Sequence, residues 1–355
     1  MDKEKTPREF GNSTAEQIYY DESLSQITEK VNICDENNIR IINMADVAVQ
    51  EVDWLLYPLI PYGKITIIQG DPGEGKTTFV LRLIAALTTG KSLMDDDNET
   101  GAFEPVNVIY QNCEDGLGDT IKPRLLDAGA NCSRVVVIDD RETEPLTMKD
   151  TRIEAVVAQT KAKLLVLDPI QGYLGSDIDM HRANEIRPVM KHLSDIAEKY
   201  NCAVILVGHM NKCSQAKAAY KGLGSIDFAA AARSVLLVGR IKNEPNIRVV
   251  CQIKNSLAPE AVSIAFELDE ESGFKWIGEY DITADDLLEG KNKSSKQENA
   301  VNFLSEQLSK GRALQTEVQN EAEKAEISYT TLKRAKKELG VVSKKIDNKW
   351  YWELP

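Results

Sequence analysis

Short hydrophobic runs alternate with longer amphipathic runs from residue 65 to residue 208. Runs typical of buried strands are Ile65–Gln69, Val106–Gln111, Arg134–Ile138, Leu164–Leu167 and Ala203–Val207. Runs with helical periodicity precede the last four, at Thr77–Leu87, Leu117–Ala128, Thr151–Thr160 and Ala183–Tyr200. Such alternation is typical of a mostly parallel sheet with helices on both faces. We therefore predict an α/β fold for the main domain, residues 41–280.

The pattern changes after Gly208, where strand-like runs follow one another without a long helix between them. These runs are Val235–Val238, Ile247–Lys254, Val262–Glu267 and Phe274–Ile277. They predict antiparallel strands at one edge of the sheet. Residues 281–296 are charged and contain serines, which indicates a linker. Residues 1–40 are a polar segment that we expect to be partly disordered, with a loose helix over residues 14–31.

Residues 297–355 predict a small separate domain of three helices and a hairpin. The helices are expected at Gln297–Leu308, Gln315–Lys324 and Ser328–Leu339, and the hairpin at Val341–Trp352. In the third helix Ser328 is a candidate N-cap and Gly340 a candidate C′ glycine.

The third helix has two faces, because Leu332, Ala335 and Leu339 fall on one side and its lysines on another. This order predicts a winged-helix-like domain whose third helix and wing contact DNA. Its candidate nucleic-acid contacts are Lys333, Arg334, Lys336, Lys337, Lys344 and Lys345. A winged helix that docks a protein is the alternative.

The net charge of −13 divides unevenly along the chain. Residues 291–355 contain 13 Lys and Arg against 9 Asp and Glu, a net charge of +4, whereas residues 1–290 contain 30 against 47, a net charge of −17. A basic module on an acidic body suits a polyanionic partner, although surface charge can serve solvation alone.

Targeting and redox signals are weak. The chain has no run of eighteen apolar residues and no apolar stretch behind its charged first residues, so we expect neither a membrane span nor a signal peptide, and a cytoplasmic protein. The six cysteines show no C-x-x-C spacing, which favours buried, reduced thiols over disulfides or zinc. They are Cys34, Cys113, Cys132, Cys202, Cys213 and Cys251.

The strongest chemical motif is G-x-x-x-x-G-K-[ST] between the strand at Ile65–Gln69 and the helix that follows it. Its glycines let backbone N–H groups surround phosphates at a helix N-terminus, Lys76 reaches the β- and γ-phosphates, and the Thr77 hydroxyl ligates Mg²⁺. The segment therefore predicts a P-loop that binds ATP and Mg²⁺. The predicted nucleotide-binding residues are Gly70, Asp71, Pro72, Gly73, Glu74, Gly75, Lys76, Thr77 and Thr78.

Carboxylates follow two other predicted strands. Asp168 ends an apolar strand, as a Walker B aspartate does, and is a second candidate magnesium ligand; a strand-terminal aspartate in a turn is the alternative. Pro169 follows it, so the glutamate that many P-loop ATPases carry next to this aspartate is missing. Glu114 is our candidate for orienting the attacking water, with Asp115 as its competitor, and one of the two is expected to cap a helix.

A third strand ends at His209, which could contact the γ-phosphate or be merely structural. The loop after it contains Lys217 and Lys221, which suit contact with a nucleic-acid backbone. A solvated surface loop is equally consistent with these residues.

Residues 44–278 resemble the RecA-like ATPases, and among them the RepA-type hexameric helicases of plasmids and mobile elements. The resemblance rests on the P-loop, on Glu114–Asp115 with Arg124–Leu125 downstream, on Asp168 and His209, and on the segment Gly224–Leu237. It implies that Arg233 acts in trans on a neighbour's nucleotide. Where related ATPases have Lys-x-Arg, this chain has Lys254 and then Ser256, so a second trans arginine is absent. Lys254 could still reach a γ-phosphate across the interface, or pair with a carboxylate as a structural residue.

The resulting prediction is a homo-oligomeric, hexameric Mg-ATPase that moves on DNA, as a replicative helicase of a plasmid, phage or integrated element does. Single-stranded DNA would pass through the ATPase ring, duplex DNA could bind the C-terminal domain, and a primase or initiator could be a partner. The alternatives are a RecA-class recombination or repair ATPase and a nucleotide-switched DNA-binding regulator.

Overall fold

The computed structural model describes residues 42–93, 103–210, 226–269, 273–290, 293–309, 311–325, 327–347 and 349–355. The chain divides into two compact units, residues 1–51 and 52–355. In the first unit the described part contains one turn of 3-10 helix, η1 (Met44–Asp46), capped by the Asn43 side chain. Our predictions for residues 1–40 lie outside the described residues.

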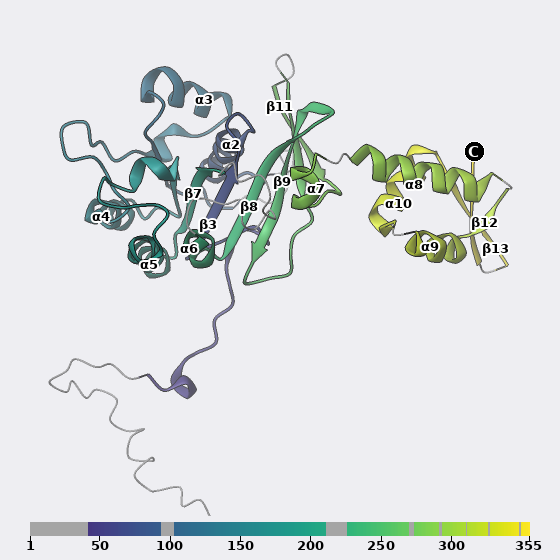
Figure 1. The fold of residues 1–355 in the computed structure, drawn as a ribbon, viewed down its shortest axis with the longest axis horizontal. Helices are drawn as coiled ribbons and strands as arrows, with labels where there is room; N and C mark the ends of the chain where they lie inside the picture. The colour runs from purple at the N-terminus through teal and green to yellow at the C-terminus, as the bar shows by residue number, and fades with distance from the viewer. Residues whose placement is uncertain are drawn as a thin grey trace, which may run out of the picture. The chain divides into compact units, whose positions relative to one another are not determined.

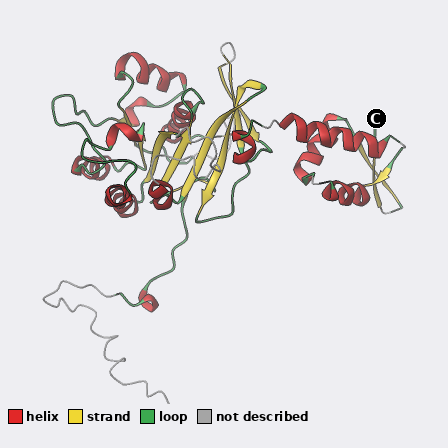
Figure 2. Ribbon diagram, in the orientation of Figure 1, coloured by secondary structure: helices red, strands yellow, loops and turns green. Residues whose placement is uncertain are grey.

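The second unit is built on a nine-stranded sheet (Figures 1 and 2). Its strand order is β11-β10-β9-β8-β3-β7-β6-β4-β5. The strands are β3 (Ile65–Gly70), β4 (Val108–Asn112), β5 (Val135–Val136), β6 (Leu164–Asp168), β7 (Ala203–His209), β8 (Ser234–Ile241), β9 (Glu244–Asn255), β10 (Ile264–Asp269) and β11 (Gly273–Glu279). A two-stranded ribbon, β1 (Trp54–Leu56) with β2 (Ile60–Pro61), precedes the sheet.

The predicted α/β architecture is confirmed, with one correction at the junction. Strands β3 to β8 are parallel, and β9, β10 and β11 continue the sheet antiparallel. We expected β8 to belong to the antiparallel edge, but it pairs in parallel with β3 through Thr66↔Ser234 to Gln69↔Leu237. The short helix before β8 supplies the crossover that a parallel connection needs.

Helices cover both faces of the sheet (Figure 1). One face carries α2 (Lys76–Thr89) and α3 (Lys122–Asp127), the latter preceded by the π-helical turn η2 (Leu117–Ile121). The other carries α4 (Thr151–Thr160), α5 (Ala183–Tyr200) and α6 (Ile226–Ala231). Two further 3-10 turns are η3 (Cys132–Arg134) and η4 (Ile170–Tyr173).

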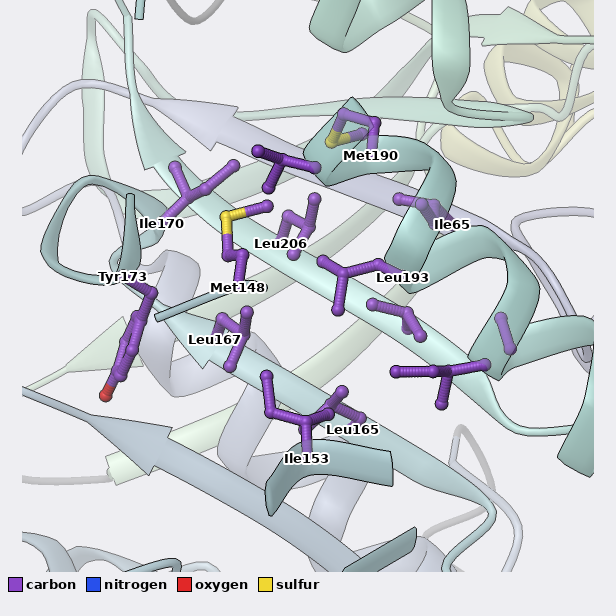
Figure 3. Packing of buried hydrophobic residues seen from close by; sticks show 14 of the residues in the cluster. Ile65, Met148, Ile153, Leu165, Leu167, Ile170, Tyr173, Met190, Leu193 and Leu206 are labelled. Atoms are coloured by element: carbon purple, nitrogen blue, oxygen red, sulfur yellow. The ribbon is translucent and has the colours of Figure 1, made fainter. Parts of the chain in front are cut away.

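The core between β6, β7 and α5 is shown in Figure 3. Leu167 and Leu206 of the sheet pack with Met190 and Leu193 of α5, and all four are buried. Strands buried on both faces explain why the central runs are continuously hydrophobic rather than alternating.

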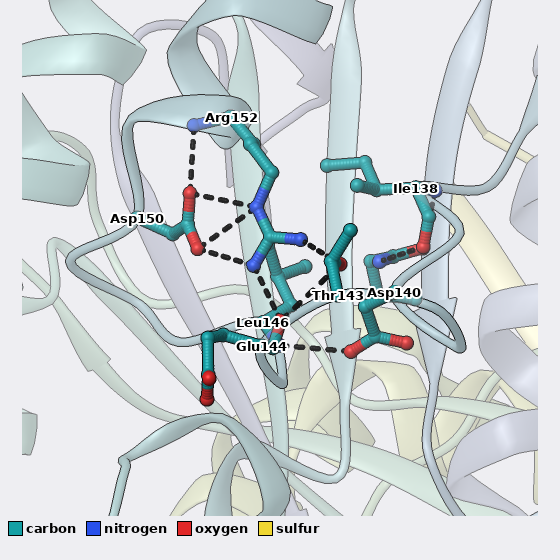
Figure 4. A network of polar contacts seen from close by, with 8 residues as sticks. Ile138, Asp140, Thr143, Glu144, Leu146, Asp150 and Arg152 are labelled. Carbon is teal, nitrogen blue, oxygen red and sulfur yellow. Dashed lines mark hydrogen bonds and ion pairs between the residues drawn. The ribbon is translucent and has the colours of Figure 1, made fainter.

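The loop after β5 is fixed by polar contacts (Figure 4). Gln111 exchanges two hydrogen bonds with the backbone of Ile138, at 3.0 and 3.1 Å. Asp150 caps α4 and binds the Arg152 guanidinium, which also donates to Thr143 at 2.7 Å. These contacts explain why β5 has two residues where five were predicted, since side-chain bonds replace the ladder beyond Val136.

The segment expected to be a linker, residues 281–296, contains structure. Thr283 and Asp286 form a capping box that starts α7 (Ala284–Leu288). Leu287 is 8% exposed and packs with Tyr280, Ile282 and Val249. We did not predict this helix because the segment is rich in acidic residues and contains a single buried leucine, which produces no hydrophobic periodicity. Helix α8 (Lys293–Leu308) also begins earlier than predicted.

The C-terminal part contains α8, β12 (Ala313–Leu314), α9 (Gln315–Lys324), α10 (Tyr329–Glu338), β13 (Val342–Ile346) and β14 (Lys349–Glu353). The three strands form a separate sheet in the order β12-β14-β13. Its own core includes Leu304, Leu332, Ala335 and Trp352. The predicted cap is confirmed, since Ser328 accepts a hydrogen bond from the Thr331 backbone N–H and Gly340 has a φ of +65°.

The cysteines in the described ranges are all free. Cys202 and Cys251 are buried as predicted, whereas Cys113 is exposed at the end of β4. Cys34 and Cys213 lie outside the described residues. Within those ranges no group of three metal-ligating side chains occurs, and no helix has the length and apolar character needed to span a membrane.

Candidate active site

A glycine-rich loop joins β3 to α2. Gly73 and Gly75 have φ values of +78° and +93°, a conformation that side chains disfavour. A Cβ on Gly70 would lie 2.2 Å from the Val238 carbonyl oxygen, so only glycine fits there. Gly75 is the N-cap of α2 and gives it no side-chain hydrogen bond. The first N–H groups of this 14-residue helix therefore point into the loop, which is the geometry of an anion site.

Lys76 is the first residue of α2 and is 6% exposed. Its Nζ donates to the carbonyl oxygens of Gly70 and Asp71, at 2.9 and 2.8 Å, and lies 3.4 Å from Nδ1 of His209. Burial lowers the pKa of Lys76, while Asp168 and nearby carboxylates act in the opposite direction. A cation held this way is positioned to exchange carbonyl contacts for phosphate oxygens.

Thr77 and Asp168 meet across the sheet. The Thr77 hydroxyl donates to Oδ2 of Asp168 at 2.9 Å, and the Tyr110 hydroxyl donates to the same oxygen at 3.2 Å. Burial raises the pKa of Asp168, while the two hydroxyl groups and Lys76 oppose the rise. A carboxylate and a hydroxyl oxygen side by side fit the hard ligands that Mg²⁺ prefers.

Glu114 and Asp115 follow β4, and their side chains have different environments. Asn112 holds both backbone N–H groups through its Oδ1, at 2.9 and 2.7 Å. Asp115 forms an ion pair with Arg124 at 2.8 Å, whereas the Glu114 side chain is exposed. The expected helix cap from one of them is wrong, because the N-cap residue of η2 is Gly116, which has no side chain to form a cap. Asn112 accepts hydrogen bonds from the free backbone N–H groups of this turn, which is the role that we predicted for Glu114 or Asp115.

Two site-adjacent arginines were not predicted. The Arg240 guanidinium lies 3.8 Å from Oε1 of Glu74 and donates to the Gly73 carbonyl at 3.3 Å. The Arg248 stem lies 3.4 Å from where a Cβ of Gly75 would be. Sequence reasoning missed both because they follow the P-loop by more than 160 positions and match no motif.

Arg233 and Lys254 lie near the amino ends of the parallel strands β3 and β8, whereas the P-loop follows the carboxyl end of β3. The Arg233 backbone N–H donates to the Ile65 carbonyl at the start of β3, and the Arg233 side chain is exposed. Nζ of Lys254 donates to three carbonyls at the end of α6, of Ala229, Ala230 and Ala232, rather than to a carboxylate. Burial lowers the pKa of Lys254, and the charge of Arg233 adds to this effect.

The candidate nucleic-acid contacts fall into three groups. Lys217 and Lys221 lie outside the described residues, as does the side chain of Arg334. Lys333, Lys337 and Lys345 are exposed. Lys336 and Lys344 form polar contacts within the domain, and Nζ of Lys345 lies 6.0 Å from the centre of the Trp350 ring.

Lys336 lies 4.6 Å from the centre of the Trp352 ring and 2.5 Å from Oγ of Ser343, and Lys344 forms an ion pair with Glu353. Lys336 was assigned to the cationic face of the helix, but it packs on the hairpin. Burial accordingly lowers its pKa.

Comparison with known proteins agrees with this site. Residues 40–215, just under half of the chain, match the family model described as an AAA domain. Proteins named DNA repair protein RadA are similar: the one from Halalkalibacterium halodurans is 24% identical over 169 residues, 47% of this chain and 32% of the relative. The one from Streptococcus pneumoniae is 24% identical over 187 residues, 52% and 39% of the two chains. The chain therefore covers about a third of the length of these relatives.

Among solved structures, a KaiC-like protein from Pyrococcus horikoshii OT3 aligns with 61% of this chain and 90% of its own length, at 19% identity and a TM-score of 0.44. The mostly parallel sheet with antiparallel edge strands and the P-loop at the end of β3 give the sheet-bearing part of the chain a RecA-like fold, and the similarity to the AAA domain model falls on its first part. P-loop proteins bind nucleotide at this loop, which joins β3 to α2.

Proposed function

We propose that this protein is a homo-oligomeric, hexameric Mg-ATPase that converts hydrolysis into movement on DNA, as a replicative helicase of a mobile element does. The observation that carries the proposal is the set of groups at the carboxyl ends of four neighbouring strands. Lys76 follows β3, His209 ends β7, Asp168 ends β6 and Glu114 follows β4. Ligands of open α/β sheets bind at this edge.

Each of these residues would have a separate role in ATP hydrolysis, set by its position in the site. The P-loop amides and Lys76 bind and orient the phosphates, and Thr77 and Asp168 would hold Mg²⁺. When bound, the ion supplies neutralisation of charge on the phosphate oxygens. Glu114, exposed and turned by Asn112, would orient the attacking water. His209 lies beside Lys76 and would report occupancy of the site to the chain that follows β7.

A transition-state cation in trans would come from a neighbouring copy. Arg233 is exposed at the opposite edge of its own sheet, so it suits a head-to-tail interface in which one copy's amino edge faces the next copy's P-loop. Lys254 would support this edge by holding the last turn of α6, the segment that leads into Arg233.

DNA as the partner is supported by two further observations. Both relatives above are named DNA repair proteins. The C-terminal part has the order helix, strand, two helices and hairpin, which is the order of a winged helix, and α10 exposes Lys333 and Lys337.

Displacement of a labelled strand from a forked duplex tests the motor function. We expect wild-type protein to displace the strand only with ATP and Mg²⁺, and Lys76→Ala protein to displace none. Light scattering with ATP and single-stranded DNA should give the mass of six chains. ATP hydrolysis without displacement on any fork polarity would refute the helicase function.

A RecA-class repair ATPase is the second candidate, because the relatives carry the RadA name. Such a protein would promote strand exchange between homologous DNAs rather than displace a strand from a fork. A nucleotide-switched regulator would do neither, and would bind duplex DNA with an affinity that depends on the bound nucleotide.

A further inference from the structure

Arg240 and Arg248 stand directly opposite each other in the antiparallel ladder of β8 and β9. Like charges in this position destabilise a sheet. Burial lowers the pKa of Arg248, Arg240 adds to the effect and Glu74 opposes it. Two guanidinium groups beside one carboxylate leave excess positive charge at this place.

The pair lies on the ligand-binding side of the sheet. Gly70 approaches Val238, and Arg240 lies two residues further along β8, beyond the end of β3. Arg240 reaches the P-loop at Gly73 and Glu74, and the Arg248 stem lies against Gly75. Both arginines therefore border the loop on the side away from His209, because β8 and β7 flank β3 from opposite sides.

Arg248 has unused hydrogen-bonding capacity. The residue is 8% exposed, and within the described part of the chain its Nε has no hydrogen-bond partner. One Nη donates to the Pro245 carbonyl. A buried donor without a partner destabilises the folded state, so an anion that accepts a hydrogen bond from Nε would remove this unfavourable contribution.

Arg240 is held only loosely. Its contacts with Glu74 and Gly73, at 3.8 and 3.3 Å, are longer than the 2.7–2.9 Å usual for charge-assisted hydrogen bonds. The Arg240 side chain is 41% exposed. A doubly or triply charged phosphate chain would compete well with one carboxylate at this distance.

We propose that Arg240 and Arg248 form a cis arginine pair that binds the phosphate chain of the nucleotide from the β8–β9 side of the P-loop, and that Glu74 occupies Arg240 until the nucleotide displaces it. The proposal rests on nucleotide binding at the P-loop. Glu74 then competes with the nucleotide for Arg240, so substitutions of Glu74 and of Arg240 should change nucleotide affinity in opposite directions.

Binding of a fluorescent ATP analogue, measured with the full chain, separates this role from a purely structural one. We expect Arg240→Gln and Arg248→Gln each to weaken binding roughly tenfold, as loss of a charge-assisted bond does. Glu74→Gln should tighten binding severalfold, because it removes the competitor and a negative charge. If Arg240 only fastens the loop through Glu74, breaking either end gives the same result, so equal weakening in Glu74→Gln and Arg240→Gln would overturn the proposal.

Controls separate charge, folding and the proposed function. Lys275→Gln removes an exposed cation from β11 of the same sheet and should leave affinity unchanged. Arg240→Lys should restore part of the affinity, and equal melting temperatures exclude misfolding. Wild-type protein that does not bind the analogue would refute the ATPase function. Wild-type affinity in Arg240→Gln and Arg248→Gln, with binding lost in Lys76→Ala, would refute the arginine pair alone.

Discussion

Arg233→Ala should abolish turnover without abolishing nucleotide binding, because Arg233 cannot reach its own site. Its backbone is level with Ile65, and the P-loop begins five residues later at the other end of β3. At about 3.3 Å per residue the separation is about 16 Å along the strand. If Arg233 is the proposed finger, it would act on a neighbouring copy, and losing such a finger costs about 10³–10⁵ in kcat.

Mixing Arg233→Ala with Lys76→Ala protein measures this directly. An active interface needs a P-loop from the first variant and an arginine from the second, so random assembly at a 1:1 ratio makes about one interface in four active. ATP hydrolysis plotted against mixing ratio should rise to a maximum near equal amounts. With subunit exchange confirmed by energy transfer between labelled chains, rates that stay on the line joining the two single variants would refute a trans role for Arg233.

Three further predictions concern single groups. Glu114→Gln should bind ATP but hydrolyse it slowly in single-turnover assays; a slower Asp115→Asn would mean that the ion pair with Arg124 conceals the true water-positioning group. Asp168→Asn should keep both hydroxyl contacts, lose hydrolysis and raise the melting temperature by a few degrees at pH 7, because burial raises the pKa of Asp168 and its ionised form destabilises the fold. This gain should shrink as the pH falls through the raised pKa of Asp168 and vanish near the ordinary pKa of an aspartate, where the carboxyl group is protonated in both the folded and the unfolded states. A gain independent of pH would contradict the cause. Changing Lys333 and Lys337 to Glu should weaken duplex binding by full-length protein and flatten its salt dependence, whereas Lys336→Gln should mainly lower stability because Lys336 packs on Trp352.

The P-loop, Asp168 and the strand–helix alternation were predictable because each depends on local sequence. A glycine-rich turn needs its glycines, and a buried parallel strand needs a hydrophobic run. Arg240 and Arg248 were not predictable, since they reach the P-loop only through the pairing of β8 with β3 and β9. Tyr110 was missed for a related reason, because in sequence it is one more hydrophobic residue of β4.

The predictions were wrong where individual side-chain contacts, rather than the hydrophobic pattern of the sequence, determine the local structure. Asn112, rather than an acid, holds the turn after β4, and one capping box with one buried leucine made α7 in a segment whose charge indicated a linker. In the C-terminal part the helical face was correct for Leu332 and Ala335. The long stem of Lys336, however, carries its charge around to the hairpin.

The central claim is that this chain hydrolyses ATP at its P-loop and uses the hydrolysis to move on DNA. The most direct measurement is steady-state ATP hydrolysis by full-length wild-type and Lys76→Ala protein, with and without single-stranded DNA. Wild-type protein should hydrolyse ATP faster when DNA is present, and Lys76→Ala should remain at background in both conditions. Equal rates in the two proteins, or a wild-type rate that DNA leaves unchanged at every concentration, would contradict the account.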